Sequence, residues 1–593
     1  MKDQNLKRIE YKRHTLAHLL AKAVLTEYPE ARPTLGPAID NGFYYDIDFS
    51  SGEAPNEADL KKIQTHMRKM LSSWTMFTHR EVSATEAREI FADNQFKLEL
   101  IDELEQKGET ITLYTAGSGK TEFTDLCRGG HCENPAEEIS ADSFKLDKIA
   151  GAYWRGDENN PMLTRIYGLA FETAEELETY EFQREEAKKR DHRKLAKELD
   201  LLVFSDLVGS GMPMWTPRGN IIRNAVINYS RKLNHKLGFG EVHTPNINKA
   251  ELFKLSGHYD QYKEDMLSVR SQYVEDEMFL KPMNCPQHTQ IYASQPRSYR
   301  DLPIRYADFA NLYRDERPGE LSGLTRLRAF AQDDGHIFCR ESQVSEELLN
   351  VLSVVKEALE MYNIGYWIRL SLHDPDNREK YLGSDADWQR SEDELRNIVK
   401  EAGIESKEVP GEAAFYGPKL DIMAVDALGR EWQISTIQVD RVQPERFDLT
   451  CINEKGEKER VVMIHRALIG SPDRFIGILI EHYGGNFPLW LAPVQLAIIP
   501  VSDAQNDYAK TVHQALKAAN LRVDLYDEND SMGKKIRKAK QEKLPYFIVI
   551  GDKEMAAKNV TLESRDGTSK QIDLHALANH LQTEIDVKGK MNT

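Results

Sequence analysis

The feature that most constrains this chain is residues 311–340, in which two strand-like runs flank a loop rich in Gly and Pro. The first run delivers Arg314 and Glu316 into the loop. The second run carries functional side chains at alternate positions: Arg326, Arg328, Phe330, Gln332, Asp334 and His336. Because alternate side chains of a strand share a face, the spacing predicts that these six form one row of an antiparallel pair. Such a row suits a site for a polyanion, a flat base and a small polar substrate better than it suits a structural sheet.

The block resembles motif 2 of class II aminoacyl-tRNA synthetases, and its FAQDDGHIFC segment resembles, within that class, the threonyl-tRNA synthetases. The resemblance implies that Arg314 neutralises charge on the α-phosphate of ATP, that Glu316 binds the adenine amino group and that Phe330 stacks on the ring. It also implies that Arg326 holds the triphosphate tail and that Gln433 contacts the nucleotide.

Two further segments resemble the remaining motifs of the class. Residues 218–237 carry a helical apolar stripe and lead into a strand-like segment at 240–245, which is similar to the dimer-forming motif 1, although an ordinary buried helix would give the same stripe. Residues 461–477 predict a strand, a turn and a helix that carries Arg474, similar to motif 3. The resemblance implies that Arg474 contacts the γ-phosphate and that Arg314 and Arg474 are the catalytic charges.

Composition narrows the class of protein. A chain of 593 residues is long enough for several domains, and 40% hydrophobic with 29% charged residues is typical of a soluble globular protein. There is no apolar run of membrane-spanning length, no signal-peptide pattern, and five scattered cysteines do not suit a disulfide framework. A net charge of −18 argues against indiscriminate nucleic-acid binding. We therefore expect a cytoplasmic protein with no membrane and no DNA partner.

The chain divides into four stretches, and the expected fold is multidomain α+β and α/β. Residues 1–172 mix helix and strand signals, and residues 173–201 form a charged linker helix. Residues 202–491 are expected to form the class II catalytic core around an antiparallel sheet. Residues 492–593 alternate strands and helices and predict an α/β domain with parallel strands. By resemblance, the outer stretches are the editing and anticodon-binding domains, and the ubiquitin-like domain with which many bacterial members begin is expected to be missing.

One thiol and two imidazoles, Cys285, His336 and His465, are candidate ligands for one Zn²⁺. A single Cys or His is more often a core residue, but each of these stands where the threonyl-tRNA synthetase family places a zinc ligand. Three ligands leave a fourth position for the hydroxyl of threonine, whereas an apolar pocket would reject isosteric valine only about a hundredfold. The resemblance places the threonine contacts at Met283, Gln332, Asp334, Tyr416 and Gln438.

Serine has the same hydroxyl group as threonine, so a threonyl-tRNA synthetase is expected to need a second site that hydrolyses tRNA wrongly charged with serine. His14 and His18 lie one turn apart on a predicted helix, and Cys127 and His131 follow much later. This spacing alone also fits a metal site. The segments resemble the editing domain of bacterial threonyl-tRNA synthetases, which implies a pocket that hydrolyses seryl-tRNA without a bound metal. The resemblance adds three further residues, Tyr45, Lys97 and Asp125. A P-loop-like segment at 116–121 has Tyr114 where the pattern needs Gly, so a turn is predicted there.

The resemblance therefore implies ATP-dependent activation of L-threonine, transfer to tRNA(Thr), hydrolysis of mischarged seryl-tRNA(Thr), Mg²⁺ with ATP, and a homodimer. The alternatives are a synthetase-like RNA-binding regulator without catalysis, and a stand-alone deacylase, which would not need residues 202–490. In the last domain, a basic helix at 532–543 suits phosphate contacts. Glu554 and Arg565 are the candidates for reading anticodon bases, because Glu563 stands where the family usually has a basic residue.

Overall fold

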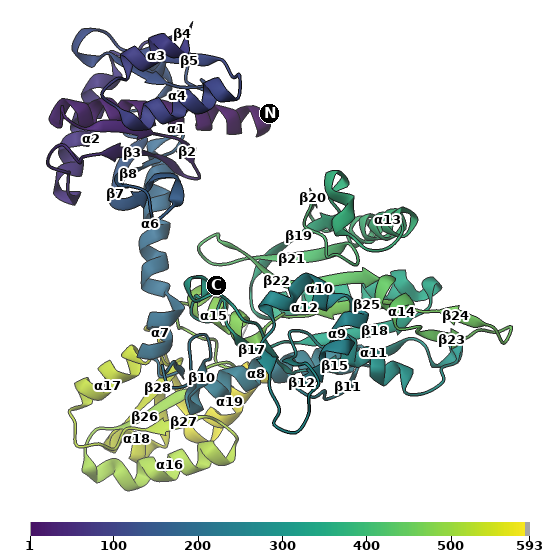
Figure 1. Ribbon diagram of the computed structural model, residues 1–593. Helices are drawn as coiled ribbons and strands as arrows, with labels where there is room; N and C mark the ends of the chain where they lie inside the picture. The colour runs from purple at the N-terminus through teal and green to yellow at the C-terminus, as the bar shows by residue number, and fades with distance from the viewer. Residues whose placement is uncertain (1, 587–593) are drawn as a thin grey trace. The chain divides into compact units, whose positions relative to one another are not determined.

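The computed structural model describes residues 2–586, with side chains from residue 7 onward, so the outer limits of the predicted first and last domains lie outside the described residues. The chain separates into two compact units, Met1–Glu185 and Glu186–Thr593. Within residues 2–586 no helix is both long and apolar enough to cross a membrane. The two units are described in turn below (Figure 1).

The first unit is built on helix α1 (Lys2–Glu27) and an antiparallel sheet. The sheet has the order β1-β3-β8-β7, with strands β1 (Arg32–Leu35), β3 (Gly42–Asp48), β7 (Phe144–Tyr153) and β8 (Met162–Ala170). Leu16, Leu20 and Val24 of α1 are buried against this sheet and against α2 (Leu60–Leu71) because they recur on one face of the helix.

A second small sheet completes this unit. It consists of β4 (Phe77–Val82), β5 (Ile111–Ala116) and β6 (Phe123–Leu126), with α3 (Ala84–Ile90) and α4 (Gln95–Gln106) between its first two strands. The segment that resembles a P-loop forms a single 3₁₀ turn, η2 (Gly119–Thr121), after β5. The turn predicted there is confirmed.

The charged stretch at 173–201, where a single helix was predicted, is broken into two helices. It forms α6 (Ala174–Arg190) and α7 (His192–Glu198). Asp191 separates them because its carboxylate accepts a hydrogen bond from the backbone N–H of Arg193 at 2.8 Å and so caps α7. The predicted continuous helix over residues 173–201 is therefore wrong at this position.

The second unit is centred on an eight-stranded sheet with the order β11-β15-β18-β25-β22-β21-β19-β20. All pairs are antiparallel except the outermost ones, β11–β15 and β19–β20. This confirms the expected antiparallel core. The strands are β11 (Gly240–Glu241), β15 (Ile304–Asp308), β18 (Asp334–Cys339), β25 (Val462–Ala467), β22 (Glu431–Asp440), β21 (Lys419–Val425), β19 (Gly365–Leu372) and β20 (Ser406–Pro410).

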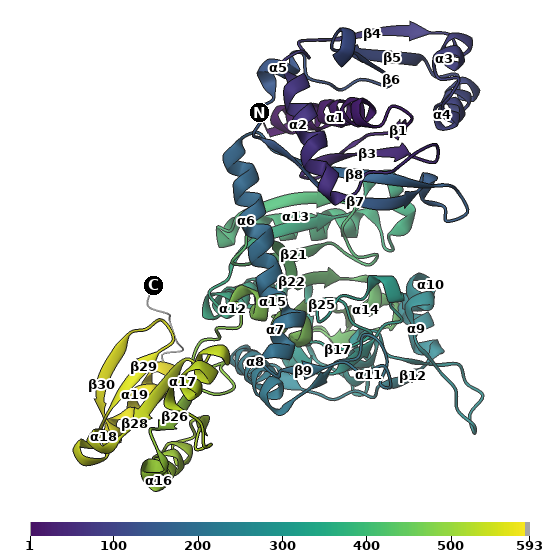
Figure 2. The same ribbon diagram turned by 90° about the vertical axis from the view of Figure 1, so that its left-hand side faces the viewer.

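Alternation along these strands separates an apolar face from a polar face. Ile337, Ile437 and Ile464 belong to the main core, which includes α8 (Pro217–Lys236), α12 (Val344–Met361), α13 (Asp385–Ala402) and α15 (Pro472–His482) (Figure 2). The next residue on β18 and β25 points to the opposite face. Register aligns a polar row across that face: Tyr306, His336, His465, Gln438 and Lys419.

The second run of the opening block is split between two sheets. β17 (Ala329–Ala331) pairs with β16 (Asn311–Tyr313), whereas β18 joins the large sheet, and the predicted arginines at 326 and 328 precede β17 in a loop. The prediction of one uninterrupted row is therefore wrong. Asp333 explains the break, because its buried carboxylate accepts hydrogen bonds from Ser230 and Arg466 and from the N–H of Leu468. These bonds anchor the chain where it leaves one sheet for the other.

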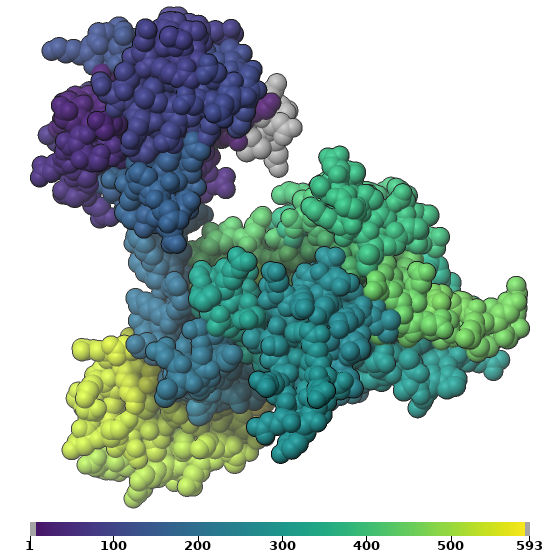
Figure 3. All heavy atoms as spheres, viewed as in Figure 1, coloured from purple at the N-terminus to yellow at the C-terminus, as the bar shows by residue number. Residues whose placement is uncertain are grey.

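Short elements frame the polar face of the large sheet. They are β12 (Ile247–Lys249), α9 (Ala250–Ser256), α10 (His258–Tyr262), β13 (Ser268–Val269), β14 (Met278–Leu280), α11 (Cys285–Ala293) and α14 (Val442–Arg446). A hairpin of β23 (Thr450–Ile452) and β24 (Lys458–Arg460) projects from the second unit in Figures 1 and 3.

The last region contains a five-stranded sheet with the order β27-β26-β28-β29-β30. Its strands are β26 (Leu496–Pro500), β27 (Val523–Leu525), β28 (Tyr546–Ile550), β29 (Asn559–Ser564) and β30 (Ser569–Asp573), with helices α16 (Asn506–Ala518), α17 (Met532–Gln541), α18 (Asp552–Ala557) and α19 (Leu574–Asp586). Strands β27, β26 and β28 are parallel, as predicted. The prediction is wrong for β29 and β30, which pair antiparallel because short connections reverse the chain.

Candidate functional site

Two adjoining cavities of about 780 and 590 Å³ open on the polar face of the large sheet. They share several lining residues, among them Arg314, Gln332 and Gln438, so they form one continuous hollow. Every residue predicted for ATP, threonine or zinc lines it. The larger part contains Met283, Cys285, Gln332, Asp334, His336, Tyr416, Gln438 and His465, and the other part contains Phe330, Gln433 and Arg474.

The three predicted zinc ligands meet in the larger part. His336 on β18 and His465 on β25 are direct cross-strand partners, and Cys285 begins α11 above them. Their ligand atoms all lie within 4.8 Å of one another, and the facing nitrogens, His336 Nε2 and His465 Nδ1, are 3.0 Å apart. Strand register therefore brings together His336 and His465, which are 129 positions apart in the sequence, and the start of α11 adds Cys285.

The outer nitrogens of both imidazoles are held by other side chains. Asp440 accepts a hydrogen bond from His465 Nε2 at 2.8 Å, which leaves Nδ1 of a neutral ring as the acceptor facing His336. His336 Nδ1 lies 2.7 Å from His288 Nδ1. Burial, followed by the neighbouring histidine, lowers the pKa of His336 and of His288 well below the ordinary value, so both rings are neutral. Carboxylate and imidazole partners of this kind orient metal-binding histidines.

The donor set fits a divalent cation. Burial, with the charges of Asp334 and Asp440 next, raises the pKa of the Cys285 thiol well above its ordinary value. A thiolate at this position therefore needs a nearby positive charge. One sulfur and two imidazole nitrogens, buried and preoriented, form a set that Zn²⁺ accepts while one coordination position stays open.

Side chains that could recognise a small amino acid surround this cluster. Asp334 is buried, and its Oδ2 accepts a hydrogen bond from Asn284 Nδ2 at 3.0 Å. Tyr416 donates its hydroxyl hydrogen to Gln438, the cross-strand neighbour of His465. The pocket thus offers a carboxylate, an amide and a phenol within one hollow, which suits an amino group and a hydroxyl group.

The smaller part of the hollow carries features suited to a nucleotide. The Arg314 guanidinium lies 5.2 Å from the centre of the Phe330 ring, and Arg326 pairs with Glu316 at 2.8 Å. Gln433 is held by Arg369 at 2.7 Å and by Asp421 at 2.9 Å. A flat ring, two arginines and a fixed amide are arranged for a base and phosphates.

Arg474 adds a cation whose side chain has an unused donor. It lies in the first turn of α15, where Ser471 accepts a hydrogen bond from its backbone N–H at 3.3 Å. Its Nε atom is buried and has no hydrogen-bond partner among the described residues, and burial lowers its pKa. A cationic donor of this kind at a helix N-terminus favours an anion in the cavity.

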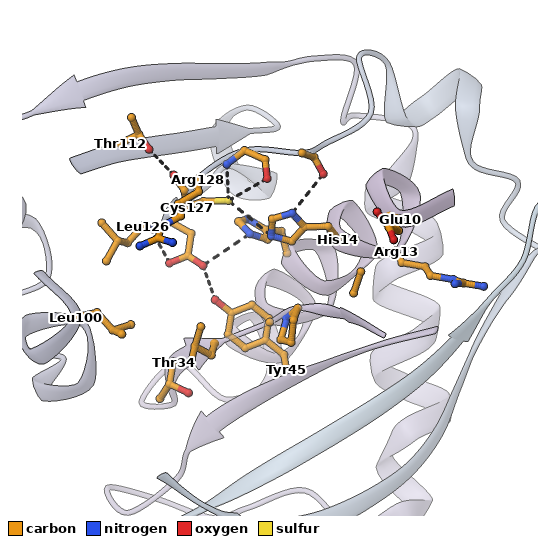
Figure 4. Close-up of a pocket in the computed structure, with 18 of the residues that line it drawn as sticks. Glu10, Arg13, His14, Thr34, Tyr45, Leu100, Thr112, Leu126, Cys127 and Arg128 are labelled. Carbon is orange, nitrogen blue, oxygen red and sulfur yellow. Dashed lines mark hydrogen bonds and ion pairs between the residues drawn. The ribbon is translucent and has the colours of Figure 1, made fainter. Parts of the chain in front are cut away.

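A third cavity, of about 660 Å³, lies in the first unit between α1 and the two sheets (Figure 4). It is lined by six of the seven residues predicted for editing: His14, His18, Tyr45, Lys97, Asp125 and Cys127. The seventh, His131, joins the cluster behind the lining, because its ligand nitrogen lies within 4.8 Å of those of His14 and His18 and of the Cys127 sulfur.

Two networks organise this cavity. The buried carboxylate of Asp125 accepts hydrogen bonds from the Tyr45 hydroxyl and pairs with Lys97 Nζ at 2.5 Å. The Cys127 sulfur lies 3.2 Å from His131 Nε2 and 3.6 Å from His14 Nε2. Figure 4 shows Tyr45 and His14 converging on the segment that carries Cys127.

Burial keeps the second network neutral. It raises the pKa of Cys127 to about 11 and is also the main cause of the lowered pKa values of His14, His18 and His131. His14 Nδ1 donates to the carbonyl of Gly130 at 3.2 Å, so its Nε2 is free to accept. The pocket therefore presents neutral imidazoles and a thiol beside a charged Lys–Asp pair. The ligand atoms of His14, His18, Cys127 and His131 all lie within 4.8 Å of one another, as a metal site would also require.

The two candidates for anticodon reading both hydrogen-bond to backbone groups of the second unit. Glu554 caps α18 by accepting a hydrogen bond from the backbone N–H of Gly551 at 2.9 Å. Arg565 donates to the carbonyl of Phe487, and burial lowers its pKa to about 10. Their role in base reading stays a prediction.

Sequence reasoning missed several residues beside the site. His288 stands three residues after Cys285 on α11, a helical spacing that could have revealed it. His258 places its Nε2 3.7 Å from the Cys285 sulfur, and burial lowers its pKa to about 3, but no spacing signal links residues 27 positions apart. Asp440 and Ser471 were visible only as an ordinary strand end and a helix cap.

Comparison with known proteins matches two segments of the chain to family models. Residues 267–483 match the family described as "tRNA synthetase class II core domain (G, H, P, S and T)", and residues 495–584 match "Anticodon binding domain". The threonine–tRNA ligase of Rubrobacter xylanophilus is 45% identical over 564 residues, which is 95% of this chain and 86% of that protein. The threonine–tRNA ligase of Deinococcus radiodurans is 46% identical over 563 residues, 94% of this chain and 85% of that protein.

A solved structure is similar as well. The crystal structure of the RNA binding domain of threonyl-tRNA synthetase from Cryptosporidium parvum has a TM-score of 0.63 and 37% sequence identity. The match covers 66% of this chain and 98% of the Cryptosporidium parvum chain.

Proposed function

Since the chain belongs to the threonine–tRNA ligase family of class II aminoacyl-tRNA synthetases, we propose that the hollow of its second unit activates threonine and that the cavity of its first unit removes wrongly attached serine. The observation that carries the first half of the proposal is the row of His336, His465 and Gln438 across the sheet, next to an arginine-lined cavity. A small polar substrate and a nucleotide can meet there.

For activation, the carboxylate of threonine attacks the α-phosphorus of ATP and pyrophosphate leaves. The attack gathers negative charge on the phosphate oxygens, and Arg314 and Arg474 are the cations proposed to stabilise it. Glu316 and Phe330 hold the adenine, Arg326 holds the triphosphate tail and Gln433 contacts the nucleotide. Mg²⁺, which class II enzymes generally use with ATP, shares the neutralisation. No side chain serves as a nucleophile, because positioning and charge are sufficient for this chemistry.

For selection, Cys285, His336 and His465 would hold one Zn²⁺, with Asp440 and His288 orienting the imidazoles. When bound there, Zn²⁺ would supply a Lewis acid that could expand its coordination for the amino and hydroxyl groups of threonine, and valine lacks the hydroxyl. Asp334 is placed to accept the hydroxyl hydrogen. Met283, Gln332, Tyr416 and Gln438 are proposed to enclose the rest of the amino acid.

For editing, the cavity of the first unit is proposed to hydrolyse the ester of seryl-tRNA(Thr). Water adds to the ester carbonyl, and the ribose hydroxyl leaves with a proton. Neutral imidazoles of His14 and His18 can accept a proton from that water, because burial keeps them uncharged. Tyr45, Lys97 and Asp125 form the charged wall that orients the substrate, and Cys127 and His131 complete the pocket.

The remaining proposals concern assembly and tRNA. We propose the domain limits 1–172, 173–201, 202–491 and 492–593, with Glu554 and Arg565 facing anticodon bases of tRNA(Thr). A homodimer is supported by exposed apolar side chains just before α8, where Leu207 is 100% exposed and Val203, Phe204 and Val208 are also exposed. Exposed apolar side chains close together in the sequence are candidates for a protein–protein contact.

The activation proposal is tested by threonine-dependent exchange of pyrophosphate into ATP. Wild-type protein should exchange rapidly with threonine and ATP and should charge tRNA(Thr). Exchange that does not depend on threonine, or that is equally fast with valine, would contradict the proposed use of the hollow.

A further inference from the structure

A buried cluster in the second unit lies at the edge of the hollow, and two of its three residues have no part in either proposed site. It consists of His192 at the start of α7, Leu324 in the loop between Glu316 and Arg326, and Glu481 near the end of α15. The three side chains are only 5, 1 and 6% exposed. With Asp191, two of them offer metal-binding atoms within 4.8 Å of one another.

The hydrogen bonds of His192 argue against a metal at this cluster. The backbone N–H of Leu324 donates to His192 Nε2 at 2.9 Å, so the lone pair of that nitrogen is occupied. The ring proton is therefore on Nδ1, which donates to Glu481 Oε1 at 2.6 Å. The same oxygen accepts from the backbone N–H of His192 at 3.0 Å. The imidazole is thus a neutral link between a loop amide and a helix carboxylate.

Two glycines allow the loop to pack closely against His192 and α15. Gly323 has a φ of +50°, and a Cβ at this residue would lie 2.2 Å from His192 Nε2. On α15, a Cβ at Gly477 would lie 3.0 Å from the Cβ of Leu324. A side chain at Gly323 would therefore force His192 or the loop to move, and one at Gly477 would be a tight fit against Leu324.

This contact point is joined directly to the nucleotide cavity. Leu324, Thr325 and Arg326 are consecutive in the loop, and all three line the smaller part of the hollow. Arg474, which lines it as well, lies one helical turn before Gly477 on α15. The link through His192 therefore fixes the loop that carries Arg326 relative to the helix that carries Arg474.

We infer that His192 is a positioning residue for ATP: by holding the Leu324 amide against α15, it sets the spacing of the loop and helix that bind the triphosphate. A loop that is already ordered loses less conformational freedom when it binds a polyanion. His192 itself touches no substrate. The inference rests on the proposed use of this hollow for ATP.

Three substitutions in the full chain separate the two hydrogen bonds. His192→Ala removes both. His192→Asn keeps a donor near Nδ1 for Glu481 but has no acceptor that reaches Leu324. His192→Gln places its amide oxygen near Nε2, where it can accept from Leu324. We expect the KM for ATP in pyrophosphate exchange to rise about tenfold for Ala and Asn and to stay within about threefold of wild type for Gln. The KM for threonine should not change.

Leu199→Ala is the matched control, because Leu199 is buried at the other end of the same helix and packs against Gly485. It should lower the thermal midpoint as His192→Ala does but leave the KM for ATP unchanged. An unchanged KM for ATP in the Asn variant, a Gln variant as impaired as Ala, or an equal rise in Leu199→Ala would overturn the inference. If the Ala variant does not fold, the KM for ATP of the Asn variant compared with that of the Gln variant tests the inference. Absence of threonine-dependent exchange in wild type would instead contradict the proposed function.

Discussion

At the scale of single residues, the structure separates groups that carry charge from groups that burial keeps neutral. Arg314 and Arg474 border the nucleotide cavity as cations, whereas His336 and Cys127 belong to clusters in which burial favours the uncharged form. The sequence suggested which residues take part, but it could not suggest these protonation states. They depend on neighbours such as Asp440 and His288, which strand register and helix spacing bring in.

Arg314→Ala should lower the single-turnover rate of adenylate formation by about a hundredfold or more, because an interaction that strengthens as charge develops acts mainly on the transition state. Threonine binding should change little. Rapid-quench measurement of adenylate with saturating ATP gives the rate, and Arg270→Ala, at an exposed arginine of the same unit that does not line the hollow, is the control. A normal rate in the Arg314 variant would show that this arginine does not serve the reaction.

Cys127 should react slowly with iodoacetamide in the folded protein. Its pKa is raised from 9.0 to about 11, so at pH 8 the thiolate is about a hundredfold less populated than in the unfolded chain. The same shift stabilises the folded state fully below pH 9, and this contribution is lost as the pH rises through about 11. Peptide mapping after labelling at pH 8, with a urea-unfolded sample as the control, measures the ratio. Equal labelling of folded and unfolded protein would contradict the neutral thiol.

At the scale of helices and strands, the alternation predicted for residues 492–593 is present, and the basic helix predicted at 532–543 is α17 (Met532–Gln541). The sequence could not predict two features. The break at Asp191 depends on whether this residue continues the preceding helix or caps a new one with its carboxylate, and both are compatible with the local sequence. The split between β17 and β18 depends on the buried contacts of Asp333 with α8 and β25, which are far away in sequence. Both are tertiary effects that override a local pattern.

The basic helix α17 should bind tRNA mainly through two of its cations. Lys534 pairs with Asp530 at 2.8 Å and Lys538 pairs with Glu528 at 2.7 Å, whereas Arg537 and Lys540 are exposed and have no ion pair among the described residues. Arg537→Ala with Lys540→Ala should weaken binding of every tRNA and make the plot of log affinity against log salt shallower by about 1.5. Lys534→Ala with Lys538→Ala should have a smaller effect. Filter binding at several salt concentrations compares the two pairs, and an equal loss for both would rule out this distinction.

At the scale of the whole molecule, each of the two compact units contains its own candidate site. The cavity of the first unit is lined only by residues of that unit, and the hollow of the second is likewise complete within its own unit. The seven editing residues and the zinc, threonine and ATP residues were predicted by resemblance, and the structure gathers each set within its own unit. The order of the strands in each sheet could not be predicted from the sequence, because strand pairing depends on contacts between distant segments.

Replacing both His14 and His18 with Ala should therefore spare threonine charging and let seryl-tRNA(Thr) accumulate. The aminoacylation rate with threonine should stay within about twofold of wild type, while deacylation of preformed seryl-tRNA(Thr) should fall by about a hundredfold or more. His79→Ala, on the strand β4 of the same unit but outside the cavity lining, is the control. Normal deacylation of seryl-tRNA(Thr) by the double variant would show that His14 and His18 do not carry out editing in the first unit.

Zinc content and amino-acid selection measured on one sample test most directly whether the second unit selects threonine through a metal. Wild type should contain about one Zn²⁺ per chain and should activate threonine, activate serine more weakly and activate valine least. Cys285→Ala should fold normally, lose the metal and lose threonine activation. A metal-free wild-type sample that activates threonine at the full rate and still rejects valine would contradict the proposed zinc site.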